Sequence, residues 1–198
     1  MLRCWLGAKV WWSDDFLSRS PVGGLNELKP FLSEHGNPYV YFTTNPLVAL
    51  LYAVKPVPKP FSFYPYGFDE KGTVVYSDYY EDAFYNLYKN RVGYLYECDH
   101  LKGLEKPTQI KDVHTSTRPI KVDRMTKIPD LYVFYKQQEE KGLFRIEKNS
   151  EIQDKTMCFV FEELRKEIEN NSLKHNPQHA MSIFIKEHFP AVWESVKN

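Results

Sequence analysis

Three features that would quickly assign a class are missing from this 198-residue sequence. Its 26 basic and 26 acidic residues balance, so it lacks the overall positive charge that is typical of nucleic-acid-binding domains. It lacks an apolar run approaching the ~20 residues of a membrane-spanning helix. Its three cysteines are too few and too widely spaced for a disulfide framework or a CxxC metal site. We therefore expect a cytoplasmic protein with reduced thiols and with neither a membrane nor a nucleic acid as its partner.

Aromatic residues, by contrast, are abundant, at 16% of the sequence with 14 Tyr and 13 Phe. This exceeds what a core needs, and it favours stacking on a flat ligand group or on a partner. Residues 1–16 contain three Trp, follow neither a helical nor a strand period, and are expected to form an atypical N-terminal segment. Residues 17–128 are predicted to form an α+β body, and residues 129–198 a helical C-terminal region packed on it.

The most patterned stretch is YVYFTTNPLVALLYAV, residues 39–54. Its aromatic and β-branched start predicts a strand over residues 39–44. Asn45 is a favourable N-cap, and Pro46 suits the first helical position, where a missing N–H has no cost. The apolar block 47–54 predicts a short helix that is buried on every side.

Further elements follow from the same patterns along the chain. Strands are predicted where β-forming residues cluster, and helices where apolar residues recur at helical spacing. A Pro- and aromatic-rich stretch, residues 55–72, is expected to be an extended loop or an irregular hairpin arm. The predicted strands are residues 73–77, 92–98 and 119–128, and the predicted helices are residues 79–89, 129–142 and 155–171, with short helical pieces around Pro177 and Pro190.

The histidines offer a metal-binding pattern that is incomplete. His175 and His179 have the i, i+4 spacing that places two ligands on one helix face. Pro177 lies between them, and no third ligand accompanies them. Solvated histidines near a helix start account for the pattern, so we expect no metal.

Strand alternation brings two chemical pairs together at the end of the strand predicted over residues 92–98. Cys98 and His100 share one face, which permits a Cys–His nucleophile, although no third group that would orient the histidine is evident. Glu97 and Asp99 share the other face as a pair that suits acid–base chemistry, or as a solvated strand end. A hydrolase around Cys98 is therefore a third hypothesis, behind the two developed below.

Together with GGLNELKP, residues 23–30, the stretch at residues 39–54 resembles a family of small, largely uncharacterised bacterial proteins. Members of that family begin with a Tyr-His-Gly-Ser-type strand and pass through a Gly/Leu-Lys-Pro segment to a Tyr-Phe-Thr-Thr strand and an Ala-rich helix. This arrangement is similar to the ADP-ribosyltransferase-like fold. The resemblance implies a split, mostly antiparallel sheet with C-terminal helices, and NAD bound beside the first two strands.

The resemblance also implies site residues. Its second motif matches Tyr41-Phe42-Thr43, and its late strand–turn–strand matches residues 111–122. Its first motif falls on Leu17-Ser18-Arg19-Ser20, where Ser18 replaces the histidine and Arg19 replaces the glycine. The implied catalytic residues are Tyr41, Thr43, Asp112 and His114, and the implied NAD-binding residues are Ser18, Arg19, Ser20, Tyr41, Thr43, Thr44 and Tyr52.

Elementary chemistry gives the second motif two interpretations. Thr43, Thr44 and the backbone N–H groups at a helix start would suit a phosphate or an amide, and Tyr41 or Tyr52 would suit stacking on a flat ring. Tyr41, Tyr52 and their apolar neighbours Phe42 and Ala49 would equally suit a core, and the Thr-Thr-Asn turn is at least a helix cap.

Two functions from different classes follow. The first is a protein that binds NAD or a related nucleotide in a cleft between residues 17–20 and 41–44. If active, it would cleave the nicotinamide–ribose bond and pass ADP-ribose to an acceptor, by positioning the ribose and stabilising an oxocarbenium-like transition state. The alternative is a non-catalytic module that engages a protein or a small ligand through the aromatic arm, residues 61–68, and the Trp-rich start. The first function requires Ser18 and Thr43 to face one cleft.

Overall fold

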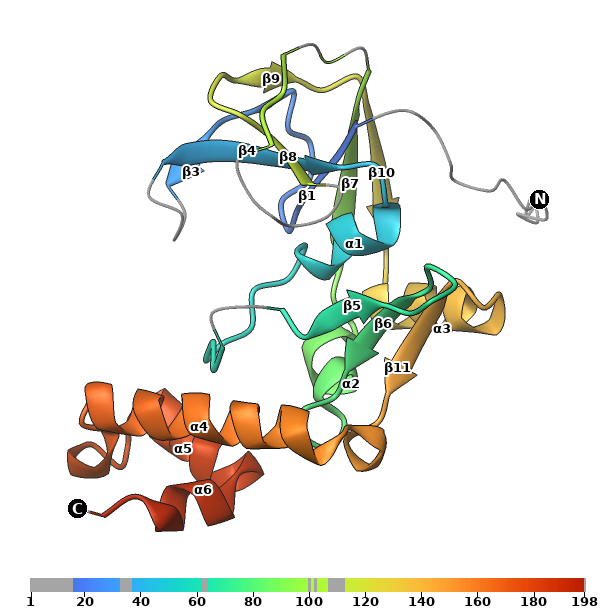
Figure 1. The fold of residues 1–198 in the computed structure, drawn as a ribbon. Helices are drawn as coiled ribbons and strands as arrows, with labels where there is room; N and C mark the ends of the chain where they lie inside the picture. The colour runs from blue at the N-terminus through green and yellow to red at the C-terminus, as the bar shows by residue number, and fades with distance from the viewer. Residues whose placement is uncertain are drawn as a thin grey trace. The chain divides into compact units, whose positions relative to one another are not determined.

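The computed structural model describes residues 16–32, 37–61, 64–99, 101, 103–106 and 113–197. The Trp-rich start, His100 and Asp112 lie outside the described residues, so the predictions made for them stay predictions. The described chain combines largely antiparallel sheets with helices, which confirms the α+β class (Figure 1).

The chain divides into two compact units, and each is described by itself. Unit 1 comprises the described residues of Met1–Ala53 and Gly93–Lys127. Unit 2 comprises those of Val54–Val92 and Ile128–Asn198. This division differs from the predicted one, because residues 54–92 belong with the C-terminal helices and not with the body that precedes them.

Unit 1 is mainly β-sheet. Its elements are β1 (Phe16–Ser20), β2 (Glu27–Leu28), β3 (Phe31–Leu32), β4 (Pro38–Thr43), α1 (Pro46–Leu51), β7 (Gly93–Cys98), β8 (Val113–Ser116), β9 (Ile120–Lys121) and β10 (Arg124–Ile128). A six-stranded sheet has the order β10-β7-β1-β4-β3, and β8 also pairs with β4. β1 is antiparallel to β4 and β7, and β4 is antiparallel to β3 and β8. A separate two-stranded sheet joins β2 to β9.

Most predicted elements of unit 1 are confirmed. β4 and β7 match the strands predicted over residues 39–44 and 92–98, and α1 matches the helix predicted after Asn45. The strand predicted over residues 119–128 is wrong as one element, since it is divided into β9 and β10. The division follows from pairing, because β9 joins β2 while β10 joins β7 in the other sheet.

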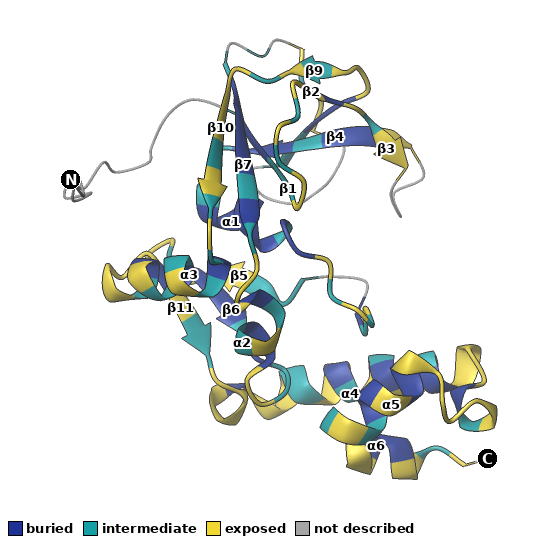
Figure 2. Cartoon of the chain, turned by 180° about the vertical axis from the view of Figure 1, so that it is seen from behind, coloured by how far each residue is buried: buried dark blue, intermediate teal, exposed yellow. Residues whose placement is uncertain are grey.

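One face of the large sheet carries a buried apolar cluster. Its fully covered members are Leu28, Val40, Phe42, Tyr96 and Cys98. Val40 and Phe42 share this face because side chains alternate along a strand. Phe42 is therefore a core residue, as the second interpretation of its motif predicted. Figure 2 shows β7 buried along most of its length.

Unit 2 combines a small sheet with helices. Its elements are β5 (Tyr66–Phe68), β6 (Val74–Ser77), α2 (Ala83–Tyr88), α3 (Leu131–Glu140), β11 (Phe144–Glu147), η1 (Asn149–Glu151), α4 (Asp154–Asn170), η2 (Leu173–His175), α5 (Ala180–His188) and α6 (Pro190–Ser195). The sheet has the order β11-β6-β5, with β11 parallel to β6 and β5 antiparallel to it. The prediction of a mostly helical region after residue 128 holds for most of its length but did not include β11. The β11–β6 pairing is also why residues 54–92 belong to unit 2.

The helices of unit 2 follow their sequence signals closely. α4 confirms the amphipathic helix predicted over residues 155–171, with Val160, Leu164 and Ile168 buried. α3 confirms the helix predicted to end at Gly142, which has a positive φ of 71°. In the described residues we find no helix that is both long and apolar enough to span a bilayer.

Two described residues of the aromatic arm, residues 61–68, make contacts within unit 2. Phe61 is buried in a cluster with residues of α4, α5 and α6, and its ring meets the Phe189 ring edge-on at 6.5 Å. The Tyr64 hydroxyl donates to the Val54 carbonyl at 2.9 Å. Phe61 therefore serves the core of unit 2, while the Tyr64 hydroxyl is bound to the backbone.

Candidate functional site

The join between β4 and α1 is closed by its own hydrogen bonds. The Asn45 side-chain oxygen accepts from the N–H groups of Leu47 at 2.9 Å and Val48 at 3.3 Å. The Thr43 hydroxyl accepts from the Asn45 N–H at 3.1 Å, and Thr43 is buried. The predicted cap is confirmed. The same bonds engage the N–H groups that were expected to receive a phosphate at this helix start.

The pairing of β1 with β4 places Ser18 and Thr43 on opposite faces of the sheet. Leu17 lies directly opposite Thr43, and directly opposed residues share a face. Ser18 follows Leu17 and therefore points the other way, where it lies opposite Tyr96 and is 3% exposed. The cleft predicted between these strands needs both side chains on one face, so that prediction requires correction.

The implied catalytic residue His114 lies on the same face as Ser18. It is opposite Phe42 in the β4–β8 pairing, and its ring lies 5.0 Å from the Phe16 ring in an edge-to-face contact. Ser20 also shares this face, two residues along from Ser18. These three implied site residues therefore line the apolar side of the sheet and not the side of Thr43.

Arg19 and Tyr41 lie on the Thr43 side of the sheet. The Arg19 guanidinium lies 5.2 Å from the centroid of the Tyr52 ring, a cation–π distance. Tyr41 lies opposite Thr115 in the β4–β8 pairing. The structure thus brings Arg19 to Tyr52 and splits the implied NAD-binding set between the two faces.

Cys98 lacks the properties of a catalytic nucleophile. Burial, assisted by the charges of Asp123, Asp99 and Glu97, raises the pKa of the Cys98 thiol to about 12. A thiol with so high a pKa stays protonated at neutral pH and is a poor nucleophile. This speaks against the hydrolase hypothesis.

The histidines predicted to be solvated near a helix start behave as expected. His175 is exposed at the end of η2, and the His179 Nδ1 accepts from the Met181 N–H at 3.3 Å as the N-cap of α5. Within the described ranges, no group of three or more His, Cys, Asp or Glu side chains could hold a metal ion.

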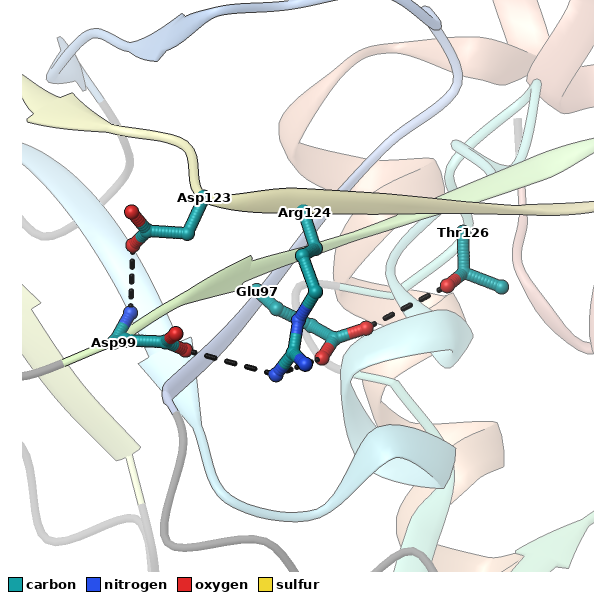
Figure 3. A network of polar contacts seen from close by, with 5 residues as sticks. All are labelled: Glu97, Asp99, Asp123, Arg124 and Thr126. Carbon is teal, nitrogen blue, oxygen red and sulfur yellow. Dashed lines mark hydrogen bonds and ion pairs between the residues drawn. The ribbon is translucent and has the colours of Figure 1, made fainter.

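Glu97 and Asp99 do come together, as strand alternation predicted, but around a cation. Figure 3 shows the Arg124 guanidinium between their carboxylates, with Nη2 at 2.9 Å from the Glu97 Oε2 and 3.8 Å from the Asp99 Oδ1. The Asp99 N–H donates to the Asp123 carboxylate at 2.8 Å, and the Thr126 hydroxyl lies 3.5 Å from the Glu97 Oε1. Glu97 is buried. The group is an ion-paired brace between β7 and β10 rather than a solvated strand end.

A polar pocket of about 260 Å³ lies beside the C-terminal end of β8. It is lined by Gly103, Glu105 and residues 115–120. Glu105 is held there by reciprocal backbone hydrogen bonds with Thr115, of 3.0 and 2.9 Å. Sequence reasoning missed this pocket. The available signal was the run HTSTRP, residues 114–119, in which hydroxyl side chains precede an arginine.

The pocket presents several kinds of polar group. Glu105 and Arg118 are the charged side chains among its described lining residues, and both are exposed. The Ser116 hydroxyl accepts from the Arg118 N–H at 3.1 Å and donates to the Arg118 carbonyl at 3.0 Å, which fixes the backbone that carries the guanidinium. Thr115 is fully buried, and its hydroxyl has no hydrogen-bond partner among the described residues. A cation, a carboxylate and hydroxyls in one concavity suit a phosphorylated polar ligand.

Comparison with protein-family models, curated proteins and solved structures finds no match to this chain. In the described part of the chain, residues at the end of β8 line a concave polar pocket.

Proposed function

We propose that unit 1 is a nucleotide-binding module of the ADP-ribosyltransferase-like class, taking NAD or a related nucleotide at the pocket beside β8. The observation that carries the proposal is the pocket lining. Arg118 is suited to a phosphate, and Glu105 with the neighbouring hydroxyls is suited to polar groups of a sugar. The resemblance supports only the ligand class, since it implies NAD beside the first two strands and not at this pocket.

The Thr115 hydroxyl gives this proposal an energetic argument. A buried polar group without a partner costs about 1–3 kcal/mol. A ligand that met this hydroxyl, after rotation of the threonine side chain, would recover part of that cost. Thr115 lines the pocket but is fully buried, so this gain is open to a ligand there only if the side chain turns its hydroxyl toward the pocket.

We expect binding without transfer of ADP-ribose. Ser18 stands where the family has its histidine, and its side chain lies on the opposite face of the sheet from that of Thr43. The proposed function is therefore a non-catalytic one. The free thiols of Cys98 and Cys158 support a cytoplasmic location as part of the same proposal.

Isothermal titration of the full chain with NAD, ADP-ribose and AMP tests the proposal. We expect saturable binding that weakens about tenfold in Arg118→Ala, the loss of roughly 1.4 kcal/mol typical of a charge-assisted hydrogen bond. Arg91→Ala, which removes an exposed arginine of unit 2, is the matched control and should bind as the wild type does. Absence of binding by all three ligands, or equal binding by Arg118→Ala, would reject the pocket as the site.

Mass spectrometry of the NAD incubation addresses transfer. We expect no time-dependent release of nicotinamide at protein concentrations that saturate the ligand. Release that depends on the protein and is lost in Arg118→Ala would instead establish cleavage of the nicotinamide–ribose bond at this pocket, with ADP-ribose passed either to water or to an acceptor.

A further inference from the structure

We infer that the pocket beside β8 selects monophosphates over di- and triphosphates, so that among the nucleotides of the proposed function it takes a mononucleotide more readily than NAD. This inference rests on the proposed function and specifies the ligand class of the same site. It is carried by the size of the pocket, by the charges of its lining and by the way Arg118 is held.

The size of the pocket favours a small part of a nucleotide. Its volume of about 260 Å³ lies below the ~300–1,000 Å³ of typical small-molecule sites. A phosphate with its sugar matches this space better than a dinucleotide does. A ligand as long as NAD would leave a large part of itself outside.

The charges of the pocket favour one phosphate over several. Arg118 and Glu105 contribute one positive and one negative charge, so the described lining has no net charge. One phosphate monoester carries about −1.5 to −2 at neutral pH, and the guanidinium can pair with it. Further phosphates add negative charge that Glu105 repels, which makes Glu105 the residue that discriminates against them.

The backbone of Arg118 is fixed before a ligand arrives. Ser116 bonds both the N–H and the carbonyl of Arg118, and Pro119 follows directly. Proline restricts the preceding residue as well as its own φ. Ser116 is therefore a positioning residue for the cation, and little backbone order must be gained when a phosphate binds.

Titration of the full chain with AMP, ADP and ATP, in EDTA and at constant ionic strength, tests the selectivity. EDTA is needed because a divalent cation would neutralise the additional phosphates. We expect AMP to bind about tenfold more tightly than ATP. Glu105→Gln should bring the two affinities close together by strengthening ATP binding. Glu70→Gln, an exposed acid of unit 2, should keep the wild-type ratio.

The outcomes separate this inference from the proposed function. If all three nucleotides bind and ATP equals or exceeds AMP in the wild type, the selectivity is refuted while nucleotide binding stands. The same holds if Glu105→Gln leaves the ratio unchanged. If none of the three nucleotides binds while NAD or ADP-ribose does, the inference fails and the proposed function stands. If NAD and ADP-ribose also fail to bind, both fail. Circular dichroism and melting of each variant confirm that the fold is retained, which the exposure of Glu105 favours.

Discussion

Asp78 in unit 2 is a buried carboxylate whose ionisation should destabilise the fold at neutral pH. It follows β6, is 7% exposed, and its Oδ1 accepts from the Phe84 N–H at the start of α2 at 2.7 Å. Burial raises its pKa from 3.8 to about 6, with the charge of Asp82 acting in the same direction and the Phe84 bond acting against it. The folded protein therefore prefers the protonated carboxyl.

The sign of the pH dependence follows from proton linkage. Between pH 4 and pH 6 the folded state holds more of the Asp78 proton than the unfolded state does, so the free energy of unfolding falls as pH rises. A difference of about two pKa units corresponds to about 3 kcal/mol of stability. Asp78 contributes this stability in full below pH 4, and the contribution is lost above pH 6.

Asp78→Asn removes the charge and keeps an oxygen that can accept from the Phe84 N–H. We expect the variant to gain stability over the wild type as pH rises, by up to about 3 kcal/mol between pH 4 and pH 8. Urea unfolding followed by circular dichroism at unit pH steps measures this difference, with the exposed Glu81→Gln as control. A difference that is constant with pH, or that shrinks as pH rises, would refute the reasoning.

Three further predictions concern unit 1. Asn45→Ala removes the acceptor of two helix N–H groups and should lower the free energy of unfolding by about 1–2 kcal/mol in thermal melts, whereas an unchanged melt would deny the cap. Thr115→Val removes a buried, unpartnered hydroxyl and should raise the free energy of unfolding by about 1–2 kcal/mol in urea. Thr115→Ser keeps the hydroxyl and should not raise it; a destabilised valine variant would mean that the hydroxyl is hydrogen-bonded. Arg124→Leu leaves buried Glu97 without its cation and should lower the free energy of unfolding by about 1–3 kcal/mol. Adding Glu97→Gln should restore part of this loss, and additive effects in the double-mutant cycle would mean that the two residues are not coupled.

The sequence predicted those features of the fold that depend on near neighbours. The Asn45-Pro46 start of α1 is a local arrangement, because the cap bonds reach only two and three residues along the chain. The shared face of Glu97 and Asp99 follows from the two-residue period of a strand. The end of α3 at Gly142 needs only a residue that accepts a positive φ. Each of these could be read from a window of a few residues.

The features that the sequence did not predict depend on distant pairing. β11 joins β6 across about seventy residues, with Phe144 opposite Val74, and its four residues carry too short a pattern to reveal a strand. The register of β1 against β4 is equally remote from any local signal. A shift by one residue would exchange the faces of every side chain in a strand, so Ser18 and Thr43 could be assigned to one cleft without contradicting the sequence.

Hydrogen bonding between distant or neighbouring groups also explains why the candidate site lies at the end of β8 and not at the strand–helix join that the sequence indicated. The join has the residue types of a phosphate site, but its Thr43 hydroxyl and Asn45 oxygen are already acceptors in the capping of α1, and the N–H groups beyond them are engaged. Groups that complete each other's hydrogen bonds have little left for a ligand. At the end of β8 the bonds of Ser116 fix the backbone of Arg118, and Arg118 and Glu105 are exposed residues of the pocket lining. Nucleotide binding is therefore proposed at the end of β8, where the pocket lining includes the charged residues Arg118 and Glu105.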